Sequence, residues 1–205
     1  MSGFVDYLST DGYILLLADV YATYAMLMVT RGRELGRESG VVPLFLGIAS
    51  LLLSIHMDVT WPLPGPFNFV FGDPFTVFSV LVLSAGTELL LFGNLKYIEG
   101  LAVPAGLISI LYGIVIALDS LDPLPVWGMF VIEGLAGALT GVSINGKNKS
   151  LMWTALVLLA LSSILLAAVC VQTTFGHVTD FAKYYPRPPQ LTCMNALPAL
   201  LLSGE

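Results

Sequence analysis

The sequence predicts an all-α membrane protein: a polytopic bundle of six transmembrane helices with both termini on the outer side. Composition is the first reason, because 57% of the 205 residues are hydrophobic, 11% are charged and the mean hydropathy is +0.88. A soluble domain carries about 25% charged residues. The second reason is that six apolar runs are each long enough to cross a bilayer core, which takes about 20 helical residues.

We place the six helices at residues 12–30, 40–59, 74–94, 98–118, 124–143 and 150–172. Basic residues occur in the first, third and fifth connectors, namely Arg31, Arg33, Arg37, Lys96, Lys147 and Lys149. The charged residues of the second and fourth connectors are all acidic, namely Asp58, Asp73, Asp119 and Asp122. Because positively charged loops stay in the cytoplasm, we expect a multi-pass protein of the cell membrane whose second and fourth connectors face outward.

The second helix carries a stripe of small and polar residues, Gly47, Ser50, Ser54 and Asp58, at spacings of three and four. Such a stripe lies on one helix face and is typical of a packing surface in lipid. The connector that follows holds Pro62, Pro64 and Pro66. Because proline cannot sit inside a regular helix and pushes the preceding residue toward extended geometry, residues 60–66 are predicted to be stiff and extended. The outer-face loop around them presents His56, Asp58, Trp61, Asn68 and Asp73.

The fourth and fifth helices are predicted to form the tightest pair. The fourth places Gly106, Ser109 and Gly113 on one face, and the fifth places Glu133, Gly137 and Gly141 on one face. Small residues let helix backbones approach closely in lipid. On this pattern Glu133 should point toward the fourth or the third helix.

We divide the chain into a six-helix transmembrane domain, 1–172, and an outer-face C-terminal tail, 173–205. The chain has two cysteines, Cys170 and Cys193, and the topology puts both on the outer side. Oxidising compartments permit disulfides, so a bond between them is predicted to staple the tail to the sixth helix. Two packed, unbonded thiols are the alternative.

Three acids, Asp19, Glu88 and Glu133, fall inside predicted spans. Ionisable groups at membrane depth are costly and usually face a bundle interior or a water-filled cavity. They are therefore candidates for a proton or polar-solute pathway. The alternative is that each is a hydrogen-bonded acid that fixes helix packing.

A metal site is a further hypothesis. His56, Asp58, His177 and Asp180 all fall on the predicted outer side, and their ligand types suit zinc or copper. The alternative is that the histidines are interfacial hydrogen-bonding anchors. The sequence requires no cofactor, although a single outer-face metal ion is compatible with it, and it offers no persuasive catalytic residues. Without a basic patch, nucleic acid is not an expected partner.

The stretch Trp61–Asn68, WPLPGPFN, followed by Phe71–Pro74, FGDP, resembles a domain-of-unknown-function family of multi-spanning membrane proteins found mainly in archaea. This resemblance implies a membrane protein and carries no activity with it. A fainter likeness to six-helix urea and amide channels rests on the tripeptide at 132–134 and on the helix count.

Three functional hypotheses follow. The first is a non-catalytic transmembrane subunit of a larger membrane complex, of the respiratory or metal-dependent oxidase type. The second is a channel or transporter for protons or small molecules that uses Asp19, Glu88 and Glu133. The third is a metal-dependent membrane enzyme with an outer-face site. The expected partners are the lipid bilayer and either other membrane subunits or further copies of the chain.

Overall fold

The computed structural model describes residues 7–63 and 66–179, and six of its helices are long and apolar enough to cross a membrane. These helices are α1 (Tyr7–Thr30), α2 (Val41–Thr60), α3 (Asp73–Phe92), α4 (Glu99–Leu118), α5 (Leu124–Gly146) and α6 (Lys149–Thr179). A 3₁₀ turn, η1 (Arg37–Gly40), precedes α2, and a π-helical turn, η2 (Asn68–Gly72), leads into α3. The prediction of six long apolar helices is therefore confirmed, whereas their orientation in the membrane stays a prediction.

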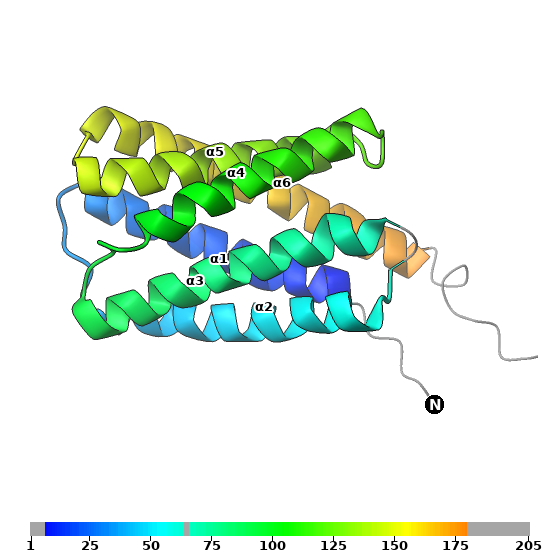
Figure 1. The fold of residues 1–205 in the computed structure, drawn as a ribbon, viewed down its shortest axis with the longest axis horizontal. Helices are drawn as coiled ribbons and strands as arrows, with labels where there is room; N and C mark the ends of the chain where they lie inside the picture. The colour runs from blue at the N-terminus through cyan, green and yellow to red at the C-terminus, as the bar shows by residue number, and fades with distance from the viewer. Residues whose placement is uncertain (1–6, 64–65, 180–205) are drawn as a thin grey trace, which may run out of the picture.

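The helices run up and down in a ring in which neighbours in sequence are also neighbours in space (Figure 1). Contacts between α1 and α6 close the ring, and α3 and α4 make the fewest contacts of any successive pair. Large apolar side chains cover the outside, including Leu52 and Ile164, each 67% exposed. An apolar exterior of this extent is stable against lipid and not against water.

The two ends of the bundle differ in charge. At one end lie the α1–α2, α3–α4 and α5–α6 connectors, with the basic residues of the sequence pattern, and we call it the basic end (Figure 1). At the opposite end, which we call the acidic end, lie the α2–α3 and α4–α5 connectors, the start of α1 and the end of α6. The last two meet there, because Ser9 Oγ is 3.4 Å from His177 Nδ1.

Glycines set the distance between α4 and α5. A Cβ atom built on Gly106 would collide with the backbone oxygen of Gly134 and lie 2.7 Å from the backbone nitrogen of Ala138. Ser109 Oγ adds a buried 2.6 Å hydrogen bond to the carbonyl of Phe130. The expected tight pair is confirmed, with one correction: Gly134 makes the closest approach, whereas a Cβ on Gly137 would be in ordinary contact at 3.6 Å.

The same device joins α2 and α3. A Cβ on Gly47 would lie 2.5 Å from the backbone nitrogen of Leu83, and one on Gly86 would collide with the backbone of Leu44. Ser50 and Ser54 are fully buried on the same side of α2. The predicted small polar stripe of the second helix is therefore its packing face.

The proline-rich connector is more sharply turned than predicted. Trp61 ends α2 in the left-handed conformation, at φ 52°, and its N–H still donates to the carbonyl of Met57. The buried Asn68 side chain then holds Leu63 from both sides, because it accepts from the Leu63 N–H at 3.0 Å and donates to the Leu63 carbonyl. Residues 64–65 lie outside the described residues. A side-chain clamp therefore shapes this connector as well as its prolines.

The sixth helix passes the predicted boundary at residue 172 and continues to Thr179. At 31 residues and 1.5 Å per residue, it is about 46 Å long, which exceeds the thickness of a hydrocarbon core. Gly176 does not stop it, since an isolated glycine costs only about 1 kcal/mol in a helix. Asp180, Cys193 and the rest of the expected tail lie outside the described residues, so the Cys170–Cys193 bond stays a prediction.

Candidate functional site

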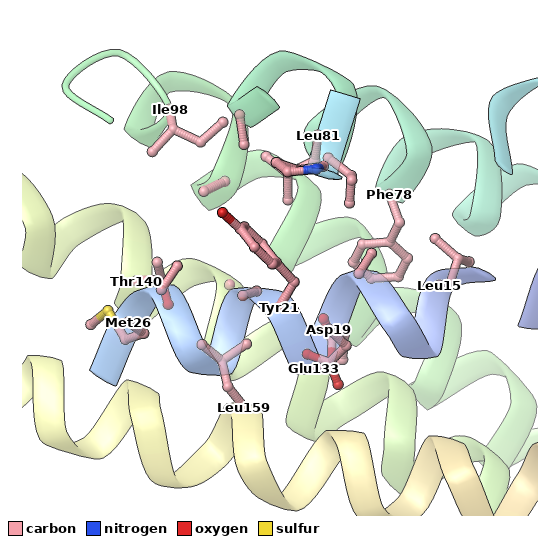
Figure 2. A pocket seen from close by; sticks show the side chains of 18 of the residues that line it. Leu15, Asp19, Tyr21, Met26, Phe78, Leu81, Ile98, Glu133, Thr140 and Leu159 are labelled. Carbon is pink, nitrogen blue, oxygen red and sulfur yellow. The ribbon is translucent and has the colours of Figure 1, made fainter. Parts of the chain in front are cut away.

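A cavity of about 170 Å³ lies inside the ring (Figure 2). Its walls are mainly apolar side chains of α1, α3, α5 and α6, such as Leu15, Phe78 and Leu159. The polar residues that line it are Asp19, Tyr21, Glu133 and Thr140. Among the described residues that line it there is no Lys, Arg or His. The cavity is therefore an apolar chamber with acidic groups and no basic partner for them.

Asp19 enters the cavity from the middle of α1 and is 6% exposed. Its Oδ2 accepts hydrogen bonds from Ser163 Oγ at 2.8 Å and from Ser162 Oγ at 3.0 Å, both on α6. Its Oδ1 is buried and has no hydrogen-bond partner among the described residues. A buried carboxyl oxygen without a partner is costly, so this atom is an uncompensated polar group of the bundle interior.

Glu133 reaches the same place from the middle of α5. Its carboxyl group interacts electrostatically with that of Asp19 and also with the Ser162 side chain. Figure 2 shows the two acids together at the cavity wall. Glu133 is only partly buried by surface area, and because it lines the cavity, part of that exposed surface opens onto the internal space.

Glu133 lines the cavity beside Asp19 of α1, and α3 residues form another wall of the same cavity. Of the two predicted directions, the one toward the third helix is compatible with this position, whereas the face of α5 that meets α4 belongs to Gly134. The cause is the helical rotation of about 100° per residue. Because Gly134 occupies the face that contacts α4, its neighbour Glu133 is turned toward the ring interior.

Glu88, the third predicted acid, is separate from this pair. It is 7% exposed and is not part of the cavity wall. Its Oε1 accepts a 2.5 Å hydrogen bond from the N–H of Tyr97, in the connector before α4. The structure therefore brings Asp19 and Glu133 together, whereas Glu88 binds the backbone of the connector between α3 and α4.

The two predicted histidine ligands lie near the start of α1 but have different neighbours. The His56 ring packs on Tyr7, with centroids 4.5 Å apart, and His177 Nδ1 contacts Ser9. Within residues 7–63 and 66–179, no three His, Cys, Asp or Glu side chains form a group able to hold a metal ion. Asp180 lies outside these residues, so the four-residue site is neither assembled nor tested here.

Two residues of the predicted outer-face loop, Asp58 and Asp73, accept hydrogen bonds from a neighbouring helix. Asp58 Oδ2 accepts from Thr76 Oγ1 at 2.9 Å, and Asp73 Oδ2 accepts from the Tyr112 hydroxyl at 2.7 Å. A Cβ atom on Gly72 would overlap Asp58 Oδ1. The glycine of η2 is therefore what lets the Asp58 carboxyl lie against the start of α3.

Sequence reasoning missed several polar residues of the interior. Ser162 and Ser163 stand together in the middle of the longest apolar run, which is a visible signal, since adjacent hydroxyls there need acceptors. Thr140 Oγ1 is buried on the cavity side and has no hydrogen-bond partner within residues 7–63 and 66–179. Asp11 was placed before the first helix, whereas it lies inside α1 and is 0% exposed.

Six long apolar helices around a pair of carboxyl groups at mid-helix define an α-helical membrane protein with an acidic interior site. The chain matches the model of a family described as protein of unknown function, DUF981, over residues 1–180, and it belongs to that family. The uncharacterised family expected from the proline-rich stretch is thereby confirmed. Comparisons with curated proteins and with solved structures find no match.

Proposed function

We propose that this protein binds a small organic cation with an apolar body at Asp19 and Glu133 and carries it across the membrane in exchange for protons. The observation that supports this most is the acid pair in an apolar cavity whose described lining has no basic residue. Two carboxyl groups side by side in such a place repel each other when ionised, so a cation has to accompany them. A proton and an ammonium group are alternative occupants.

The size and walls of the cavity narrow the class of ligand. A cavity of about 150 Å³ lined by apolar side chains is known to hold one benzene molecule, and this one measures about 170 Å³. Calcium and magnesium ions take six to eight oxygen ligands and zinc prefers Cys and His side chains, neither of which a wall of Leu, Phe, Ala and Met supplies. A protonated amine with an apolar body the size of a benzene ring fits both the acids and the walls.

The ring has a place where such a ligand can enter and leave. Of all successive helices, α3 and α4 make the fewest contacts, and the α3 residues Phe78, Leu81 and Val82 form one wall of the cavity. Separation of α3 from α4 would open that wall without breaking the glycine-packed pairs. The subunit and enzyme hypotheses stay predictions, and nothing described here favours either over transport.

The test is binding of radiolabelled benzylamine to the purified protein in detergent, followed by uptake into proteoliposomes with an outward proton gradient. Hydrogen bonds to charged groups contribute about 1.5–3 kcal/mol, so Asp19→Asn and Glu133→Gln should each weaken binding about 10–100-fold. Unlabelled benzyl alcohol, which has the same shape and no charge, should not compete.

Glu88→Gln is the matched control. It removes a buried acid of the same bundle that lies off the cavity, and the amide oxygen can still accept from the N–H of Tyr97. Benzylamine should bind this variant as it binds the wild type. Equal binding by Asp19→Asn, Glu133→Gln and the wild type would contradict the proposal, and binding without uptake would restrict it to a receptor role.

A further inference from the structure

A second buried acid has no part in the cation site. Asp11, on α1, is 0% exposed, and its Oδ1 accepts a 2.5 Å hydrogen bond from Ser50 Oγ on α2. Ser50 Oγ is in turn 2.6 Å from Ser79 Oγ on α3, and Ser79 donates to the Phe75 carbonyl. The other oxygen of Asp11, Oδ2, is buried without a hydrogen-bond partner among the described residues.

Asp11 lies in the second turn of α1, which begins at the acidic end. Asp58, on the last turn of α2, interacts electrostatically with Asp11 and also with Asp73 at the start of α3. Asp58 and Asp73 are only partly buried. From α6, Cys170 lies against Gly12 and His177 contacts Ser9, and from α2 the His56 ring packs on Tyr7. The acids that act on Asp11 therefore come from one side, and the outermost are within reach of solvent.

The space around Asp11 limits what it can bind. Asp11 lines neither the central cavity nor the smaller one beside Gly12, Phe75 and Cys170. A metal ion or an amine needs room for itself and for its ligands, and a proton needs none. An ionised carboxylate with an unpaired oxygen is far more costly to bury than the neutral acid, so adding a proton relieves the cost of this site.

We propose that Asp11 is a proton-binding site, separate from the central acid pair, that is loaded from the acidic end through Asp58. In the transfer, the O–H bond of the Asp58 carboxyl group breaks and an O–H bond forms on an Asp11 oxygen, with no change in electron count. Ser50 and Ser79 hold the Asp11 carboxyl group in place. Phe75, whose carbonyl accepts from Ser79, also lines the central cavity.

Infrared difference spectroscopy of the protein in lipid nanodiscs tests this without any amine. A stepwise change in pH should change the carboxylic-acid C=O stretching band of Asp11, and Asp11→Asn should remove that band. Asp58→Asn should keep the band and slow its response to a rapid pH jump about tenfold, which corresponds to about 1.4 kcal/mol of barrier. Because the readout is a proton on a carboxyl group, the result does not depend on benzylamine binding.

Two results would overturn the proposal. The first is an Asp11→Asn spectrum that matches the wild type over the whole pH range, which would make Asp11 a packing group. The second is an unchanged response rate in Asp58→Asn, which would exclude loading through Asp58. If Asp11→Asn does not fold, Ser50→Ala takes its place. It keeps the acid, removes the hydrogen bond to Oδ1 and should move the pH at which the Asp11 band changes, and an unmoved band would again overturn the proposal.

Discussion

Two faces of α5, represented by the neighbouring residues Glu133 and Gly134, differ in how they are packed. The Gly134 face meets α4 backbone to backbone and gains the Ser109 hydrogen bond to Phe130. The Glu133 face lines the cavity and carries an acid beside another acid. Further along this face the Thr140 hydroxyl is buried and has no hydrogen-bond partner in the described part of the chain. One face is arranged for stability. The other holds empty space and uncompensated polar groups, which natural proteins retain where function requires them.

The largest effect is expected on the packed face. Gly134→Leu should prevent correct assembly, because a Cβ there would collide with the Gly106 backbone oxygen and lie 2.9 Å from the Ile110 backbone nitrogen. Overpacking against backbone atoms that cannot move aside costs about 3 kcal/mol or more. Thermal unfolding in mild detergent should show a lost or strongly lowered transition. Gly137→Ala is the matched control, since its Cβ would lie 3.6 Å from the nearest atom, the Ala102 carbonyl oxygen, and a comparable loss there would refute the argument.

A smaller loss is expected for Ser109→Ala. The change removes the buried 2.6 Å hydrogen bond from Ser109 Oγ to the Phe130 carbonyl. Because the Phe130 carbonyl keeps its helical N–H partner within α5, the expected cost is about 1 kcal/mol, the usual contribution of a neutral hydrogen bond. The same melting assay measures it. An unchanged melting temperature would mean that glycine contacts alone hold α4 against α5.

On the cavity face, we expect a substitution to stabilise the protein instead of destabilising it. Glu133→Leu should raise the free energy of unfolding by about 1 kcal/mol, because an apolar side chain replaces a buried acid next to Asp19. Ser162 keeps the Asp19 carboxylate and the Leu159 carbonyl as acceptors. The same variant should lose benzylamine binding. A stable protein that has lost its ligand would separate function from folding, whereas a clear drop in melting temperature would show that Glu133 supports the fold.

The smallest effect is expected for Thr140→Val, which removes a buried hydroxyl that has no hydrogen-bond partner among the described residues. The two side chains have nearly the same shape, so the change should stabilise the protein by about 0.5 kcal/mol. If the variant instead loses stability only when benzylamine is present, the Thr140 hydroxyl contacts the bound ligand. A loss of stability without ligand would contradict its unpaired state.

Much of the architecture was predictable because it depends on local pattern. Six apolar runs predicted six helices, and small residues at spacings of three and four predicted which of them pack tightly. The ends of the helices were harder. The predicted first helix, 12–30, leaves Asp11 outside, whereas α1 begins at Tyr7. The predicted sixth helix ends at residue 172, whereas α6 continues to Thr179. The energetic signal at a helix end is small, and tertiary contacts such as Ser9 with His177 outweigh it.

By itself, the sequence determined the class of protein, the helix count and the acids that carry the candidate chemistry. Hydrophobicity and residue spacing settle these, because each depends on one helix and its surroundings. Only the tertiary structure decided which acids meet. Asp19 and Ser163 are 144 positions apart, and Asp11 finds Ser50 and Ser79 on two other helices. On α5, Gly134 contacts α4 and its neighbour Glu133 lines the cavity. The packing of the whole ring sets the rotation of α5 about its axis and therefore decides which of the two faces the cavity.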